Sequence, residues 1–76
     1  MIRVTIGTNT NRKAVTVDPN RTIKSVLDEN DVNYITGTLH LDGATLQPGE
    51  INKTFAEFGI TDSCYLISVV KADNAR

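Results

Sequence analysis

The first seventeen residues alternate between apolar and polar positions. Ile2, Val4 and Ile6 are separated by single polar residues, and a period of two predicts a strand with one buried face. The alternation pauses in a small, polar stretch at residues 7–11 and resumes over residues 13–17. Because small polar residues tolerate the backbone angles of a turn, the pattern predicts a β-hairpin.

The spacing changes to that of a helix after Pro19, which cannot donate a hydrogen bond to a sheet. Thr22 is a good helix N-cap, because its hydroxyl can accept from free amides of the first turn. Ile23, Val26 and Leu27 then recur at helical spacing and form one apolar stripe. A helix this short does not form alone, so we expect it to pack across a sheet.

The rest of the chain predicts further strands and one short helical turn. Leu39 and Leu41 indicate a third strand with both leucines inward, and residues 45–46 are expected to form a short edge strand. Thr54 and Glu57 match a capping box, the reciprocal pairing of side chain and backbone that begins a helical turn.

Residues 64–70 predict the last strand, and two registers are possible for it. In one register the inward side chains are Tyr65, Ile67 and Val69. In the other they are Cys64, Leu66 and Ser68. The first register buries far more apolar surface, so we expect that one. Leu66 and Ser68 would then face away from the core.

Composition places the chain among small globular domains. It has 76 residues, of which 39% are hydrophobic and 22% charged, and this predicts one domain over residues 1–71 with a frayed tail at 72–76. The net charge of −1, without clustered Lys and Arg, argues against nucleic acid. No apolar run is long enough for a membrane span. A single cysteine and the absence of a signal-like start favour a cytoplasmic setting.

The predicted order of strand, strand, helix, strand, short turn and strand is similar to that of the ubiquitin-like β-grasp fold. Residues 17–23 resemble ubiquitin's strand-to-helix entry, and residues 39–43 resemble its third strand and following turn. Residues 54–60 read Thr-Phe-Ala-Glu-Phe-Gly-Ile, where ubiquitin has Thr-Leu-Ser-Asp-Tyr-Asn-Ile. The resemblance implies an α+β fold, in which a mixed sheet of four to five strands packs on one helix plus a short 3₁₀ or helical turn.

The C-terminal sequence differs from that family. Ubiquitin and the sulfur carriers of thiamin and molybdopterin synthesis end in Gly-Gly, which an activating enzyme converts to an adenylate. Here residues 71–76 read Lys-Ala-Asp-Asn-Ala-Arg, and the last glycine of the sequence is Gly59. We therefore expect that this protein is not conjugated to other proteins. A C-terminally activated carrier or modifier related to the sulfur carriers is the alternative. A stand-alone, diverged domain of this kind favours a bacterial source.

The resemblance also indicates where a partner would bind. Most partners of ubiquitin dock on a hydrophobic patch centred on an isoleucine of the third strand, and the matching position here is His40. In the expected register, the sheet face away from the helix carries Arg3, Thr5, His40, Leu66 and Ser68. We expect a monomeric adaptor that binds another, unidentified protein there. Assembly through an exposed edge strand is a third possibility.

No group of residues indicates catalysis, so we expect no enzyme, no cofactor and no metal. A Cys64–His40 dyad is conceivable if both side chains face outward, but no acid or oxyanion motif accompanies it. The oxygen-rich residues 28–31 do not fit a calcium loop, because Val32 and Asn33 stand where an oxygen ligand and a glycine are required.

Overall fold

The computed structural model of the chain describes residues 1–8, 10–35 and 37–70. The predictions for the tail at 72–76, and for chemistry at the C-terminal end, concern residues outside these ranges. The strands and helix are β1 (Ile2–Thr8), β2 (Arg12–Val17), α1 (Ile23–Glu29), β3 (Gly37–Leu41), β4 (Ala44–Thr45) and β5 (Ser63–Val70). Two 3₁₀ turns, η1 (Pro48–Asn52) and η2 (Ala56–Phe58), lie between β4 and β5.

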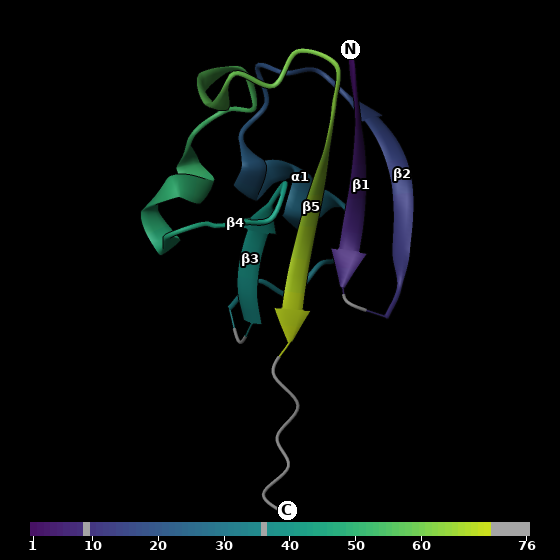
Figure 1. Cartoon of the computed structure of the whole chain (residues 1–76), viewed down its shortest axis with the longest axis vertical. Helices are drawn as coiled ribbons and strands as arrows, with labels where there is room; N and C mark the ends of the chain where they lie inside the picture. The colour runs from purple at the N-terminus through teal and green to yellow at the C-terminus, as the bar shows by residue number, and fades with distance from the viewer. Residues whose placement is uncertain (9, 36, 71–76) are drawn as a thin grey trace, which may run out of the picture.

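The strands form one mixed sheet in the order β2-β1-β5-β3-β4. β1 runs antiparallel to β2 and parallel to β5, and β3 runs antiparallel to both β5 and β4. In Figure 1 the strands stand in front of α1, so the helix covers one face of the sheet. This confirms the expected α+β class, with five strands, one helix and short 3₁₀ turns.

The core lies between this covered face and α1. It is built from the inward side chains of β1 and β3, the stripe of α1 and the aromatic residue before η2: Ile2, Val4, Ile6, Leu39, Leu41, Ile23, Val26, Leu27 and Phe55. All of these are at most 6% exposed. Burying each such side chain stabilises the fold by about 1.5–3 kcal/mol, which is why the short helix persists in this context.

Both predicted caps are present. The Thr22 hydroxyl accepts from the backbone N–H of Ser25 at 3.2 Å and begins α1. At the later turn, the Thr54 N–H donates to the Glu57 carboxylate at 2.8 Å, and the Glu57 N–H donates to the Thr54 hydroxyl at 3.1 Å. Gly59, with a left-handed φ of 77°, ends η2. Within the described ranges, no helix combines the length and apolarity needed to cross a membrane.

The predicted register of β5 is wrong. The side chains that face the core are those of Cys64, Leu66 and Ser68, which are at most 3% exposed, whereas Tyr65 is 55% exposed. The expectation that Tyr65, Ile67 and Val69 point inward therefore has to be reversed.

Pairing with β1 and one long-range hydrogen bond explain the observed register. Val4 lies opposite Cys64, and Ile6 lies opposite Leu66, so the buried positions of the two parallel strands coincide. The buried Ser68 hydroxyl donates to the backbone carbonyl of Asn33 at 2.6 Å. Because a hydrogen-bonded hydroxyl can be buried at little cost, Ser68 does not oppose this register.

Candidate functional site

The side of the sheet away from α1 is the candidate functional surface, which we call the open face. By the alternation of each strand it consists of Arg3 and Thr5 on β1, Arg12, Ala14 and Thr16 on β2, Thr38 and His40 on β3, and Tyr65, Ile67 and Val69 on β5. Cross-strand pairing places Thr5 between Ala14 and Tyr65, and places Ile67 opposite His40.

Three of the five predicted binding residues belong to the open face, and two do not. Arg3, Thr5 and His40 occupy outward strand positions, as expected. Leu66 and Ser68 are both 0% exposed and face the core, so the prediction that they form part of the surface is wrong. This error follows directly from the reversed register of β5.

Tyr65 and Ile67 take the positions that had been expected for Leu66 and Ser68. Both sets of alternate positions along β5 contain apolar residues. This pattern indicates a strand with one side buried in the core and an outer side that is also apolar. Choosing the register by apolar area alone overlooked this second meaning, and it placed Tyr65 in the core and Leu66 on the outer side.

The apolar centre of the open face is small and has a polar tip. Tyr65 is 55% exposed, and Ile67 is only 8% exposed although no described element covers this face. The cross-strand neighbours of Ile67 are Gly7 and His40. A tyrosine ring beside a shielded aliphatic side chain is a suitable seat for an apolar group of a partner.

Two backbone hydrogen bonds hold Tyr65 in place. The Tyr65 N–H donates to the Asp42 carboxylate at 2.9 Å, and the Tyr65 carbonyl accepts from the Asp42 N–H at 2.9 Å. Asp42 itself has a left-handed φ of 51° in the turn after β3. The backbone at Tyr65 is therefore fixed by β1 on one side and by this turn on the other.

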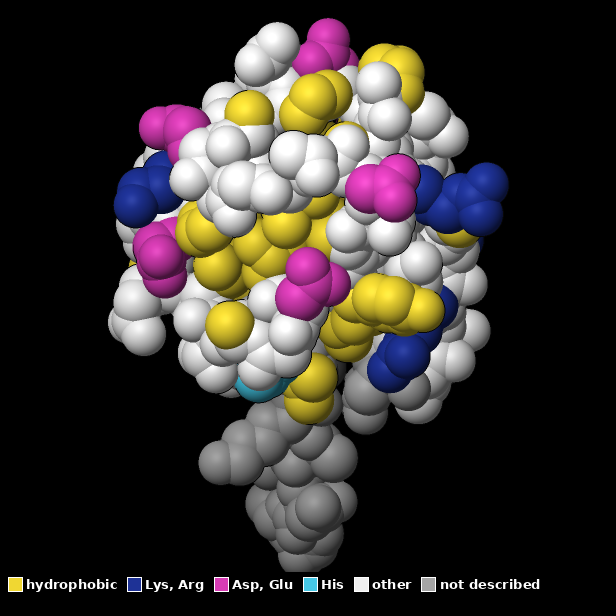
Figure 2. Space-filling model, turned by 45° about the horizontal axis from the view of Figure 1, so that its top comes forward, with side chains coloured by type: hydrophobic (Ala, Val, Ile, Leu, Met, Phe, Trp, Pro, Cys, Tyr) yellow, Lys and Arg dark blue, Asp and Glu magenta, His cyan; other side chains and the backbone are white. Residues whose placement is uncertain are grey.

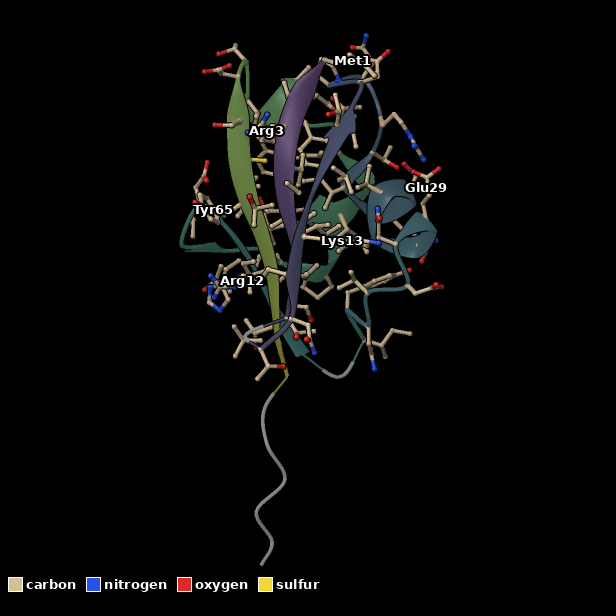
Figure 3. The ribbon with its side chains drawn as sticks, turned by 90° about the vertical axis from the view of Figure 1, so that its right-hand side faces the viewer. Met1, Arg3, Arg12, Lys13, Glu29 and Tyr65 are labelled. Carbon is tan, nitrogen blue, oxygen red and sulfur yellow. The ribbon has the colours of Figure 1, made fainter. Side chains whose placement is uncertain are left out.

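Arginine side chains lie beside this apolar centre, on the neighbouring strands β1 and β2. In Figure 3, Arg3, Tyr65 and Arg12 project on the side away from α1, whereas Lys13 and Glu29 lie on the helix side. The Arg12 Nε donates to the Thr8 carbonyl at 3.3 Å. Neither Arg3 nor Arg12 takes part in an ion pair with another residue that the structure describes.

The ion pairs of the described chain lie at α1. Arg21 contacts Glu29 at 2.8 Å, and Lys24 contacts Asp28 at 3.1 Å. The Tyr34 hydroxyl also donates to Asp28 at 2.8 Å, and this hydrogen bond, followed by that from Lys24, lowers the pKa of the Asp28 carboxyl. These contacts give the carboxylates of Asp28 and Glu29 local partners.

The geometry does not support the Cys64–His40 dyad. Cys64 faces the core and is 3% exposed, while His40 lies on the open face. Burial, and to a lesser extent the charge of Asp42, raise the pKa of the Cys64 thiol to about 11. The residues that the structure describes contain no cluster of three or more His, Cys, Asp or Glu side chains that could hold a metal ion.

Two further hollows lie beside β3 and β4. One of about 440 Å³ is lined by apolar residues that include Tyr34, Ile35 and Leu46. Another of about 330 Å³ has Leu41 and Phe58 in its wall and the carboxylates of Asp42 and Glu50 among its lining residues. Figure 2 shows a hollow with a hydrophobic floor and acidic side chains around it. Neither hollow is lined by His or Cys.

No model of a known protein family matches the sequence, and no curated protein matches it either. Similar solved structures do exist. One is the ubiquitin-like domain of an Arabidopsis thaliana protein, with a TM-score of 0.71 and 24% identity, covering 99% of this chain and 82% of that one. Another is a ubiquitin-like protein from the hyperthermophilic archaeon Caldiarchaeum subterraneum, with a TM-score of 0.55 and 18% identity, covering 93% and 97%. The chain therefore has the ubiquitin-like β-grasp fold.

Proposed function

We propose that this protein is a non-enzymatic interaction module that binds another protein through the open face. The observation that carries the proposal is the exposed Tyr65, 55% accessible, beside Ile67 on a sheet face that no described element covers. Tyrosine is enriched among the residues that dominate binding energy, since it offers a large, rigid apolar surface with a polar tip.

The rigidity of the surface supports this role. Tyr65 lies on β5, which pairs with β1 on one side and with β3 on the other. Its backbone N–H and carbonyl both form hydrogen bonds with Asp42. A surface that is already ordered loses little conformational entropy when a partner binds. His40, Arg3 and Thr5 are expected to contact the partner around this centre.

A peptide selection tests the proposal without knowledge of the natural partner. Random peptides displayed on phage are selected against the immobilised protein, and the affinity of each selected peptide is then measured by fluorescence polarisation. Tyr65→Ala should weaken binding by about tenfold or more, the usual effect of truncating a central aromatic contact. Ile35→Ala is the matched control, because Ile35 is also apolar and 83% exposed but precedes β3 and occupies no strand position of the open face.

The two variants give opposite readings of the surface. Peptides that lose affinity for Tyr65→Ala and keep it for Ile35→Ala would support binding through the open face. Peptides that keep their affinity for Tyr65→Ala, or lose it for Ile35→Ala, would overturn the proposal. Both substitutions remove exposed side chains, so both variants should keep their fold. A thermal unfolding curve of each variant checks that it is folded.

A further inference from the structure

We propose that the open face recognises an acidic segment of its partner. An apolar side chain of that segment would lie on Tyr65, and carboxylates on either side of it would reach Arg3 and Arg12. This inference rests on the proposed function and specifies the chemistry of the partner.

The distribution of charge on the open face is the first argument. Its strand positions include Arg3, Arg12 and His40 but no Asp or Glu. Two acidic residues lie next to it in the loops that flank β3 and β5: Asp42, whose carboxylate accepts from the Tyr65 N–H, and Asp62, which lines a hollow with Arg3. An acidic segment is therefore the partner whose charge complements this surface.

The contrast with α1 is the second argument. Both cations at the helix, Arg21 and Lys24, have an acidic partner within 3.1 Å. Arg3 and Arg12 have no such partner among the described residues, although both project into solvent from the same face. Their guanidinium groups are thus available to bind carboxylates, for which their planar fork is well suited.

The register of the sheet gives the spacing of the two arginines. Arg3 lies opposite Thr16, and Arg12 is four positions further along β2, which corresponds to about 13 Å along the strand. Tyr65 pairs with Thr5, and Thr5 pairs with Ala14, so Tyr65 stands midway between the levels of the two arginines. This order is visible in Figure 3, where Arg3, Tyr65 and Arg12 follow one another down the open face.

That spacing defines the segment that fits. Two carboxylates at positions i and i+4 of an extended peptide are also about 13 Å apart, and an apolar residue at i+2 lies midway between them. Each exposed arginine–carboxylate contact changes affinity by only about two- to fivefold. The apolar residue would thus supply most of the affinity, and the arginines would select acidic over basic segments.

A designed peptide pair tests the inference directly. The acidic probe is Gly-Ser-Glu-Ser-Leu-Ser-Glu-Ser-Gly, and the basic probe replaces both Glu residues by Lys. Each is titrated into the ¹⁵N-labelled protein, and binding is followed from the amide signals of β1 and β5. The acidic probe should bind more tightly by about fivefold or more, and raising NaCl from about 0.02 M to about 0.5 M should reduce this preference.

Charge-reversal variants assign the preference to the two arginines. The double variant Arg3→Glu/Arg12→Glu should lose affinity for the acidic probe by about tenfold and gain affinity for the basic probe. Lys13→Glu is the matched control, since it adjoins Arg12 in the sequence but lies on the helix side (Figure 3). It should change the affinity by less than about twofold.

The outcomes distinguish this inference from the proposed function. The inference is overturned if the acidic probe does not bind, if the basic probe binds wild type as tightly, or if a poly-uridine strand binds more tightly than the acidic probe. Phage-selected peptides that depend on Tyr65 but not on Arg3 and Arg12 would also overturn it and leave the open face as the binding surface. Peptides independent of Tyr65 would instead remove the proposed function itself.

Discussion

Cys64, the one cysteine of the sequence, shows what a single buried side chain does in this fold. It lies opposite Val4 in the pairing of β1 with β5 and is 3% exposed. Burial raises the pKa of its thiol to about 11, because a thiolate in the core would lose its hydration. Cys64 is therefore a small core residue and not a nucleophile at neutral pH.

The raised pKa predicts how stability depends on alkaline pH. The neutral thiol is favoured in the folded state, so this contribution is fully present below the unfolded pKa of about 8.5–9 and is lost as pH rises towards about 11. We expect the free energy of unfolding to fall by on the order of 2 kcal/mol more in wild type than in Cys64→Ala between about pH 8.5 and pH 11.

Urea unfolding of both proteins at several pH values measures this difference. Lys and Tyr titrate in both, so their effects cancel in the comparison. Cys64→Ala should be less stable at neutral pH, since it leaves a small cavity, and the two curves should converge as pH rises. Curves that stay parallel up to pH 11 would show that the Cys64 thiol is not buried in the core.

Strands β3 and β5 approach each other closely where β3 begins. A Cβ atom added to Gly37 would lie 2.8 Å from the Ser68 hydroxyl oxygen and 2.9 Å from the Val69 carbonyl oxygen. The small residue at position 37 leaves room for the inward Ser68, whose hydroxyl reaches the Asn33 carbonyl. This pair of small residues thus joins β5 both to β3 and to the segment that follows α1.

Replacing Gly37 by alanine should therefore be costly. Gly37→Ala is expected to lower the free energy of unfolding by about 1–3 kcal/mol, the usual cost of overpacking. Gly49→Ala is the control, because Gly49 has no atom within 4 Å of the added Cβ, and we expect it to be neutral or slightly stabilising. The midpoints of urea unfolding compare the two, and equal midpoints would contradict the close approach of β3 and β5.

Local signals were sufficient to predict the elements themselves. Thr22 and the stripe of Ile23, Val26 and Leu27 predicted α1, and the reciprocal bonds of Thr54 and Glu57 confirm the later cap. These features depend on residues within one or two turns of each other. The same is true of the alternation that predicted β1 and β2.

The register of β5 could not be predicted in this way, because distant contacts determine it. Ser68 is satisfied by Asn33, which is 35 residues earlier in the chain, and the alignment of Leu66 with Ile6 depends on parallel pairing. Since a shift by one residue exchanges the two faces of a strand, this single error placed two of the five candidate residues on the wrong side.

The whole molecule is divided between a packed face and an open face. α1 and the 3₁₀ turns contribute side chains that pack in or against the apolar core. The ion pairs of the described chain lie at α1. The opposite face of the sheet carries Tyr65 and the two arginines (Figure 3). The proposal for binding follows from this division, because the open face combines an exposed tyrosine with arginines that have no acidic partner among the described residues.

The measurement that tests this division most directly compares Leu66→Ala with Tyr65→Ala in equilibrium urea unfolding. Leu66 is 0% exposed, so its truncation should cost about 2–5 kcal/mol or prevent folding. Tyr65 is 55% exposed, so its truncation should cost less than about 1 kcal/mol. If Tyr65→Ala proved the more damaging change, Tyr65 would belong to the core, and the open face described here would not exist.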